Sequence, residues 1–575
     1  MTGKSLNILH SSVEGGIQAQ CEDILGRLDG EVTVLSLVFF FGTPRAEEYG
    51  SSEEAILSAC RSHFGEALPM VTCVAQKPIG TELAAEALYL RDEAWVEYHE
   101  DYLVVTSGEE AELVSRGIHY PSAGDTGAQS KLVFGRLGDI LDEEGFKVSD
   151  IVRQWNYIEG ITSVSDGVQN YQMFNDARSV FYSGADWSGG YPAATGIGCA
   201  WGGVTVSIYA VKGFTGLNRP VDNPLQVPAH RYSEKVLEDG GLEVRSTPKF
   251  ERARILGRTV FISGTAAIKG EDSELMTDPA VQSRAAVEVV ENLVDPGNLG
   301  CGHFDFEALR VYIKDEADAS VIIDSLRSRW HGIPMHFLIA DICRPELLLE
   351  IEGTGTTGRF LECCCTDAEE ATEAEKGGAS RIELCEDLPC GGVTPSEENI
   401  RRTLSNVNIP VNVLIRVRGG DFVYSEKEIS EMVESIKLCK GLGVNAVVIG
   451  ALRPDGSIDT EACKRLVEAA DGLHITFHRA FDECSDPLAA LEDIIALGCD
   501  RLLTAGHATN VNDGAAMLKT LVHKAGDRIT ILAGSGVRPA NIAWLESMTG
   551  VQEFHSSSHG PSGRTSSSTV AAMVL

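Results

Sequence analysis

An eightfold alternation of short apolar runs and helical stretches between residues 361 and 558 constrains the fold of this chain most strongly. Each run is rich in β-type residues, and most are followed by a segment of helical period, such as 425–443. Strands that alternate with helices form parallel βαβ units, and eight such units fit a closed (β/α)8 barrel. We expect the barrel strands at 361–365, 380–385, 411–420, 445–450, 473–481, 500–506, 529–536 and 551–558.

Charged residues and glycines gather where these apolar runs end, and the C-terminal strand ends carry the chemistry of such barrels. Arginine forks suit carboxylate or phosphate groups, a histidine can act as a general acid or base, and a glycine-rich turn can cradle phosphate. The alternative is a buried salt-bridge network of Glu383, Arg416 and Arg479 that only closes the barrel. The candidate barrel site comprises Glu383, Arg416, Arg418, His478, Arg479, His555, Gly534 and Gly536.

Composition and charge exclude several classes of partner. The 575 residues carry a net charge of −36, which argues against nucleic acid and anionic membranes as partners. The small anionic substrate that we expect would need a local cluster of arginines working against this overall field. The longest apolar run, 32–42, is too short to span a bilayer, and the N-terminus has no signal-peptide pattern. Fifteen cysteines, three of them consecutive at 363–365, fit a reducing compartment, so we expect a cytoplasmic protein.

Changes in sequence rhythm predict the domain boundaries. The segment 353–359 is small and poor in apolar residues, and we interpret it as a linker before a barrel at 360–575. Upstream, a helix at 283–292 and strand-like runs at 308–313 and 336–341 indicate an α+β fold with a mixed sheet. A polar stretch near 233–247 divides this part into 1–245 and 246–352, giving an α/β and α+β multidomain protein.

The barrel region resembles the copper homeostasis CutC family. The resemblance rests on five motifs in order, IELCEDLPCGGVTPS, IRVRGGDFVYS, TFHRAFDE, LTAGH and EFHSSS, and covers nearly all of 361–558. It implies a TIM barrel that binds Cu(I). The family's cysteines at the ends of the first two strands match Cys364 and Cys385, and adjacent strands lie about 4.8 Å apart, so both could share one ion. The alternative is that both are small apolar residues that fill the barrel.

The barrel departs from this family at its C-terminus. Only some seventeen residues follow the eighth run, where the family continues with a longer loop and a closing helix. The sequence therefore leaves open whether the barrel has its last helix.

The segment 250–293 and the ending at 339–353 resemble the RidA/YjgF superfamily. Upstream motifs at 151–161, 170–182, 191–198 and 220–233 narrow the resemblance to its chorismatase branch, which hydrolyses the enolpyruvyl ether of chorismate. This resemblance implies a catalytic acid at Glu350 and a pocket-lining cysteine at Cys343. The two lie seven residues apart, an odd spacing, so the chain between them must bend, and Pro345 supplies a reason.

Chorismate carries two carboxylates, which arginines can bind with two parallel hydrogen bonds each. Tyrosines can supply hydroxyl donors, and a glycine lets the backbone approach the ligand closely. No cofactor is expected in this part. The substrate-binding candidates are Arg344, Arg153, Arg178, Arg231, Tyr157, Tyr232 and Gly264.

Three hypotheses about function follow. The first is a chorismatase-like hydrolase fused to a copper-binding barrel. The second makes the front part a RidA-type imine deaminase, which Arg344 permits and Glu350 opposes. The third is a non-catalytic front part that trimerises, leaving copper binding as the function. RidA-type folds assemble as trimers, so each hypothesis includes a homo-oligomer.

Overall fold

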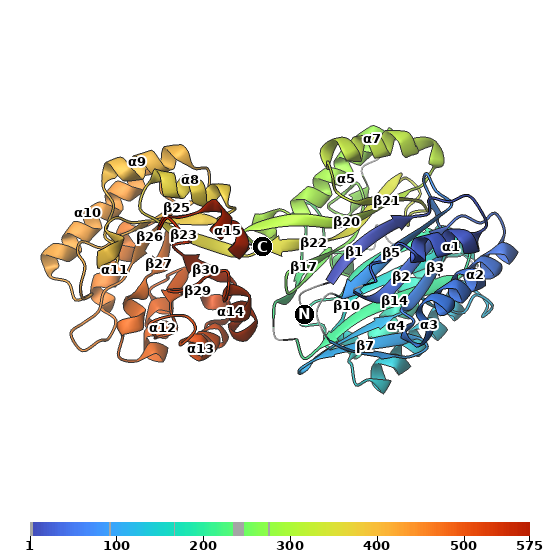
Figure 1. The fold of residues 1–575 in the computed structure, drawn as a ribbon, viewed down its shortest axis with the longest axis horizontal. Coiled ribbons are helices and arrows are strands. Elements are labelled where there is room, and N and C mark those ends of the chain that lie inside the picture. Colours follow the sequence, from blue (N-terminus) through green and yellow to red (C-terminus); the bar gives the residue numbers. More distant parts are fainter. Residues whose placement is uncertain are drawn as a thin grey trace. The chain divides into compact units, whose positions relative to one another are not determined.

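The computed structural model describes residues 4–30, 32–90, 94–165, 167–214, 216–233, 246–273 and 277–574 (Figure 1). The chain divides into two compact units: Met1–Leu299 with Phe304–Thr357, and Gly300–His303 with Gly358–Leu575. Most of the stretch near 233–247, where the sequence suggests a break, lies outside the described residues. None of the helices in the described ranges is both long and apolar enough to cross a membrane.

Three larger sheets form the N-terminal unit. The first has the order β1-β5-β2-β3, and its core includes residues of helices α1 and α2. Its elements are β1 (Lys4–His10), α1 (Ile17–Leu25), β2 (Thr33–Phe41), α2 (Ala46–Phe64), β3 (Met70–Val74) and β5 (Leu83–Leu90).

The second sheet has the order β13-β10-β14-β8-β7-β6, with β9 paired to β14. Apolar residues of helices α3 and α4 share its core. Its elements are β6 (Trp95–Tyr98), β7 (Tyr102–Ser107), β8 (Glu110–Ser115), β9 (Ile118–His119), α3 (Thr126–Glu143), β10 (Ile151–Glu159), α4 (Asn170–Tyr182), β13 (Ala193–Cys199) and β14 (Val204–Lys212).

The third sheet is mixed, as the sequence predicts, with the order β15-β16-β17-β22-β20-β21-β4. Helices α5 and α7 contribute to its core. Its elements are β4 (Lys77–Pro78), β15 (Asn218–Val221), β16 (Ala253–Leu256), β17 (Thr259–Thr265), α5 (Pro279–Leu293), α6 (Pro296–Leu299), β20 (His303–Ile313), α7 (Ala319–Arg329), β21 (Met335–Ile339) and β22 (Leu349–Gly358). Four two-residue strands form two further antiparallel pairs: β11 (Val164–Ser165) with β12 (Val168–Gln169), and β18 (Ile268–Lys269) with β19 (Asp272–Ser273).

The segment 353–359, predicted as a linker, is instead the second half of β22 and pairs antiparallel with β17 as far as Thr356. Its small residues serve close packing rather than flexibility. A Cβ on Gly353 would overlap the backbone and side chain at Ala308 and Leu309, and one on Gly355 would overlap the ring of Phe304. Both positions therefore need glycine because strand β20 packs too closely against β22 to leave room for a side chain.

The C-terminal unit is a closed parallel barrel of eight strands, which confirms the predicted fold. Each expected run contributes one strand, although every strand except the first is shorter than expected, the third and fifth most of all. The strands are β23 (Phe360–Cys365), β24 (Arg381–Leu384), β25 (Val411–Leu414), β26 (Ala446–Ile449), β27 (His474–Phe477), β28 (Arg501–Thr504), β29 (Thr530–Gly534) and β30 (Glu553–Ser556).

Helices follow the strands around the barrel, and their apolar faces share one core with the outward-facing residues of the strands. The last helix is present, which resolves the question that the sequence left open. Its Val570 and Met573 are buried, and Gly377 at the end of α8 has no side chain that would block its approach. The helices are α8 (Ala368–Lys376), α9 (Glu397–Asn406), α10 (Glu426–Leu442), α11 (Thr460–Ala469), α12 (Pro487–Ala496), α13 (Ala515–Ala525), α14 (Ile542–Thr549) and α15 (Ser567–Val574).

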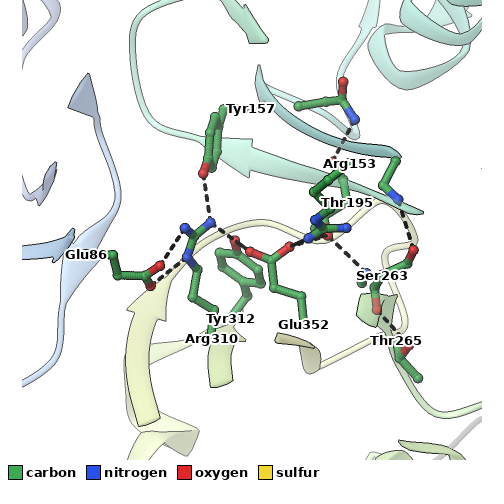
Figure 2. A network of polar contacts seen from close by, with 12 residues as sticks. Glu86, Arg153, Tyr157, Thr195, Ser263, Thr265, Arg310, Tyr312 and Glu352 are labelled. Atoms are coloured by element: carbon green, nitrogen blue, oxygen red, sulfur yellow. Dashed lines mark hydrogen bonds and ion pairs between the residues drawn. The ribbon is translucent and has the colours of Figure 1, made fainter. Parts of the chain in front are cut away.

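A buried network of charged groups joins the three sheets of the N-terminal unit (Figure 2). Arg310 of β20 donates two hydrogen bonds of 2.6 Å to Glu86 of β5 and one of 2.7 Å to Glu352 of β22. Glu352 also accepts from Arg153 of β10, which forms an ion pair with it. Burial alone would raise the pKa of Glu86, but Arg310 and His336 lower it to about 2. The carboxylates and arginines of this network therefore stabilise one another as ion pairs.

Replacing Arg310 with methionine should lower the free energy of unfolding of this unit by about 3–5 kcal/mol, because two buried carboxylates would lose their partner. Urea denaturation followed by tryptophan fluorescence measures this, since five of the six tryptophans lie in this unit. The matched control is Arg329→Met, which breaks an exposed ion pair with Glu291 and should have a much smaller effect on the free energy of unfolding. Equal costs for the two variants would contradict a role for the buried network.

Candidate functional sites

Glu350 lies near the start of β22 and is buried, with a carboxyl group that abuts the backbone of β17. A Cβ on Gly264 would overlap Oε1 of Glu350, so only glycine fits there. The pairing of β17 with β22 shifts register between Ile262 and Thr265, which places Gly264 in this irregularity. The backbone N–H of Gly264 donates to Oγ1 of Thr195 at 3.0 Å. This arrangement fixes the strand beside the acid.

The environment of Glu350 favours the protonated acid. Burial, followed by the nearby negative charge of Glu352, raises its pKa to about 8, although Arg252 acts in the opposite direction. A carboxyl group with this pKa is mostly protonated at neutral pH. It can therefore donate a proton, as general acids in buried sites do.

Cys343 and Tyr171 lie within electrostatic range of Glu350. Burial, with a contribution from Glu350, raises the pKa of the Cys343 thiol to about 12, so the thiol keeps its proton. Burial, Cys343 and Glu350 also raise the pKa of Tyr171 on α4. Cys343 lies in the irregular stretch between β21 and β22, where the sequence predicts a bend. The structure thus brings Cys343 and Glu350 to one site.

Several positively charged side chains lie near this site and, among the described residues, form no ion pair with a carboxylate. Arg178 and Arg252 are 1% and 3% exposed, and each has a buried Nε with no hydrogen-bond partner. In the described part of the chain neither forms an ion pair with an acidic side chain. Burial and the charge of Arg178 lower the pKa of Lys249. Uncompensated buried cations are costly, so this site suits an anion.

Arg344 and Tyr232 border the same cations. Arg344 donates to the carbonyl oxygen of Glu271 at 3.0 Å and to Oγ of Ser273 at 2.9 Å, and its guanidinium lies 5.6 Å from the centre of the Tyr232 ring. The Tyr232 hydroxyl accepts a 2.5 Å hydrogen bond from Arg252. Arg252 thus contacts Tyr232 directly and also acts on Glu350, whose pKa its positive charge lowers.

Three of the predicted substrate-binding residues lie elsewhere in the structure. Arg153 and Tyr157 belong to the buried network, where Arg153 pairs with Glu352 and Tyr157 accepts a 2.9 Å hydrogen bond from Arg310 (Figure 2). Arg231 is exposed, in a short 3-10 turn. Arg153 and Tyr157 thus already have partners within this network, and their assignment to the substrate stays a prediction. Sequence reasoning missed Arg252, Lys249 and Tyr171, although the cationic run 249–254 was a signal for the first two.

The predicted metal residues of the barrel meet at adjacent strand ends. Cys364 and Glu383 are register partners on β23 and β24, and His555 comes from β30 on the other side of β23. Donor atoms of Cys364, Glu383 and His555 all lie within 4.8 Å of one another. The sulfurs of Cys364 and Cys385 are 3.6 Å apart. These four residues form the barrel site considered below.

A layer of paired charges lies beneath the barrel site. Nδ1 of His555 forms a 2.7 Å hydrogen bond with the carboxylate of Glu362. The same carboxylate accepts hydrogen bonds from Arg381 at 2.5 Å and from Asn412 at 3.0 Å. Burial would raise the pKa of Glu362, but Arg381 and His555 lower it. Glu383 has no such partners: its Oε2 is buried without a hydrogen bond, and burial raises its pKa to about 7.

The arginines among the remaining barrel candidates have partners in nearby loops and helices. Arg416 donates to carbonyl oxygens of Gly392 at 3.0 Å and Gly420 at 2.6 Å, and Arg418 forms an ion pair with Glu428. Arg479 pairs with Asp482. Among the described residues, Glu383, Arg416 and Arg479 make no salt bridges with one another, so the alternative network is not what closes this barrel.

His478 and the two glycines complete the set. His478 is buried, and burial together with Arg416 lowers its pKa to about 3. Its Nδ1 accepts a 3.2 Å hydrogen bond from the backbone of Ala480. A Cβ on Gly534 would crowd Leu503 and His555, while Gly536 has a φ of +87°. Gly534 thus provides the space that His555 occupies.

Comparisons with known proteins find relatives of both units. A model of the CutC family matches residues 359–560. The family protein CutC of Parabacteroides distasonis is 48% identical over 200 residues, which cover 35% of this chain and 82% of that protein. The chain belongs to the CutC family. CutC of Pasteurella multocida is 44% identical over the same shares of both chains. The crystal structure of a putative copper homeostasis protein CutC from Streptococcus agalactiae is 36% identical and covers 35% of this chain and 98% of that chain, with a TM-score of 0.34.

Part of the N-terminal unit of this CutC-family chain is similar to chorismatases. A model described as "Chorismatase FkbO/Hyg5-like, N-terminal" matches residues 89–210. A chorismatase crystal structure covers 61% of this chain and 98% of that chain, with 21% identity and a TM-score of 0.47. In this chain a region similar to chorismatases, at residues 89–210, thus precedes a CutC barrel.

The raised pKa of Glu350 gives a prediction about stability. Between its unfolded pKa, near 4.5, and about 8, the folded state holds a proton that the unfolded state has released, so stability falls as pH rises. Glu350→Gln should remove a slope of about 1.4 kcal/mol per pH unit from the free energy of unfolding between pH 5 and 8. Urea denaturation by tryptophan fluorescence measures it. Exposed Glu288→Gln should leave the slope unchanged; equal slopes for all three proteins would contradict the assignment.

Proposed function

We propose that the N-terminal unit hydrolyses the enolpyruvyl ether of chorismate or a close relative, with Glu350 as the acid. The observation that carries this proposal is a buried carboxyl group, held protonated with a pKa of about 8, beside buried arginines that have no acidic partner among the described residues. Such a site combines an acid with binding groups for a dianion. Both are required by enol-ether cleavage of a dicarboxylate.

The reaction begins with transfer of the Glu350 proton to the methylene carbon of the enol ether. The double bond supplies the electron pair for the new C–H bond, and the ether oxygen stabilises the resulting oxocarbenium ion. Water adds to the cationic carbon and returns a proton to the Glu350 carboxylate. The hemiketal then collapses to pyruvate and the alcohol, so the net reaction consumes one water and no cofactor.

Arg178, Arg252 and Arg344 are the groups that we assign to the substrate carboxylates. Arg178 and Arg252 each have an unpartnered buried N–H, which a carboxylate oxygen could accept. Arg344 is half-buried and lies over the Tyr232 ring. Cys343, with its pKa near 12, shapes the pocket beside the acid as a neutral thiol rather than as a nucleophile.

Purified full-length protein should release pyruvate from chorismate, and Glu350→Gln should lower the rate by about 10²–10⁴-fold because it has no proton to transfer. The wild-type rate should also fall as pH rises through about 8, where the acid loses its proton. A coupled pyruvate assay measures both effects.

The matched control is Glu288→Gln, an exposed change on α5 that should keep full activity. Isothermal titration with chorismate should show that Glu350→Gln still binds it. Full turnover by Glu350→Gln would remove this residue from the mechanism. If no protein releases pyruvate but all accept imines, the RidA-type deaminase is favoured instead.

The barrel has a second candidate function, Cu(I) binding by Cys364 and Cys385. Two thiol sulfurs 3.6 Å apart at a barrel mouth suit a soft ion, and both side chains are buried. The described cysteines are all free thiols, which supports a reducing compartment such as the cytoplasm, where Cu(I) is the stable form.

The double change Cys364→Ser with Cys385→Ser should lower Cu(I) binding by one ion per chain in an anaerobic titration with a chromogenic competitor. The matched control is Cys363→Ser, because Cys363 faces the outer core next to Ser558. The proposal fails if the double variant and the control bind the same number of ions.

A further inference from the structure

We propose that the barrel also holds a divalent ion of the zinc class, bound by Cys364, Glu383 and His555. This goes beyond Cu(I) binding, which needs only the two cysteines. The two ions would share Cys364 and differ in every other ligand. The site therefore has its own chemical signature and can be tested separately.

Three adjacent strands converge on this site. Cys364 of β23 and Glu383 of β24 are register partners, and β30, which carries His555, pairs with the opposite edge of β23. Their donor atoms lie within 4.8 Å of one another. Zinc bonds of about 2.0–2.3 Å place ligands about 3.3–3.8 Å apart in a tetrahedron, so the side chains need to close by about 1 Å.

Two further observations point to an ion. Oε2 of Glu383 is buried without a hydrogen-bond partner, which is costly for a carboxyl group unless something binds it. His555 is held through Nδ1 by Glu362, which leaves Nε2 as the nitrogen for a metal. A carboxylate that orients a histidine in this way is the usual outer shell of a zinc site. Arg381 and Asn412 in turn hold Glu362.

Charge also favours a divalent ion. A dication with one thiolate, one carboxylate and a neutral imidazole has no net charge, which suits a buried site. Cu(I) with two thiolates would carry a net charge of −1 and leave the Glu383 carboxyl without a cation. The mixture of sulfur, oxygen and nitrogen donors is typical of zinc, whereas Cu(I) prefers sulfur.

Three protein ligands leave a fourth position open, as in catalytic rather than structural zinc sites. An ion there would bind water or an oxygen atom of a small substrate. Such an ion would polarise the bound group.

The test is a titration of chelator-treated full-length protein with Zn²⁺ and, for spectroscopy, Co²⁺. We expect one ion per chain and a thiolate-to-cobalt charge-transfer band. His555→Ala and Glu383→Gln should each weaken Zn²⁺ binding by at least about 100-fold. Glu362→Gln, which weakens the hold on Nδ1 of His555 and also the buried ion pair with Arg381, should weaken it by about 10–100-fold. Thermal melting checks that each variant is folded, and the conservative Glu383→Gln keeps the side-chain volume.

Cys385→Ser separates this proposal from Cu(I) binding. It should abolish the two-cysteine Cu(I) site but leave Zn²⁺ affinity within about threefold, whereas His555→Ala should do the opposite. Cys363→Ser should change neither. The proposal is overturned if no Zn²⁺ binds, or if folded His555→Ala binds it as tightly as the wild type. Loss of Cu(I) binding alone would leave the zinc site standing.

Discussion

The N-terminal unit depends on one buried carboxylate, Glu352, because it is shared by arginines from two different sheets. Arg310 reaches it from β20 while also binding Glu86 of the first sheet, and Arg153 reaches it from β10 of the second. Removing any member would leave an unpaired charge in a nonpolar interior, which is far more costly than losing an exposed pair. Its charge also bears on function, because it raises the pKa of Glu350.

Both units use the same electrostatic arrangement in unrelated folds. In each, one buried carboxylate is paired with cations, and a second carboxyl group close by forms no ion pair with an arginine or lysine of the described residues. Glu352 and Glu350 form this pair on β22, and Glu362 and Glu383 form it on β23 and β24. The paired carboxylate stays charged and holds the structure, whereas the other has a raised pKa. It is the second group that can exchange a proton or bind a cation.

The sequence predicted the parts of the molecule that depend on local pattern. Apolar runs located the eight barrel strands, and adjacency of strands predicted that Cys364 and Cys385 would meet, as their 3.6 Å separation confirms. The structural role of Arg153 could not be predicted, because its partner lies 199 residues away in the chain. The glycines near 353–358 suggest flexibility as a sequence, and only the position of β20 shows that they serve close packing.

Gly264 has a consequence for how this protein can diverge. The space that its side chain would need is occupied by the Glu350 carboxyl group, so a side chain at position 264 would compete with that group for the same space. A larger residue at 264 is tolerated only if the acid is shortened or lost. Among relatives, these two positions should therefore change together, and a chain that has lost its glycine there will also have given up this acid.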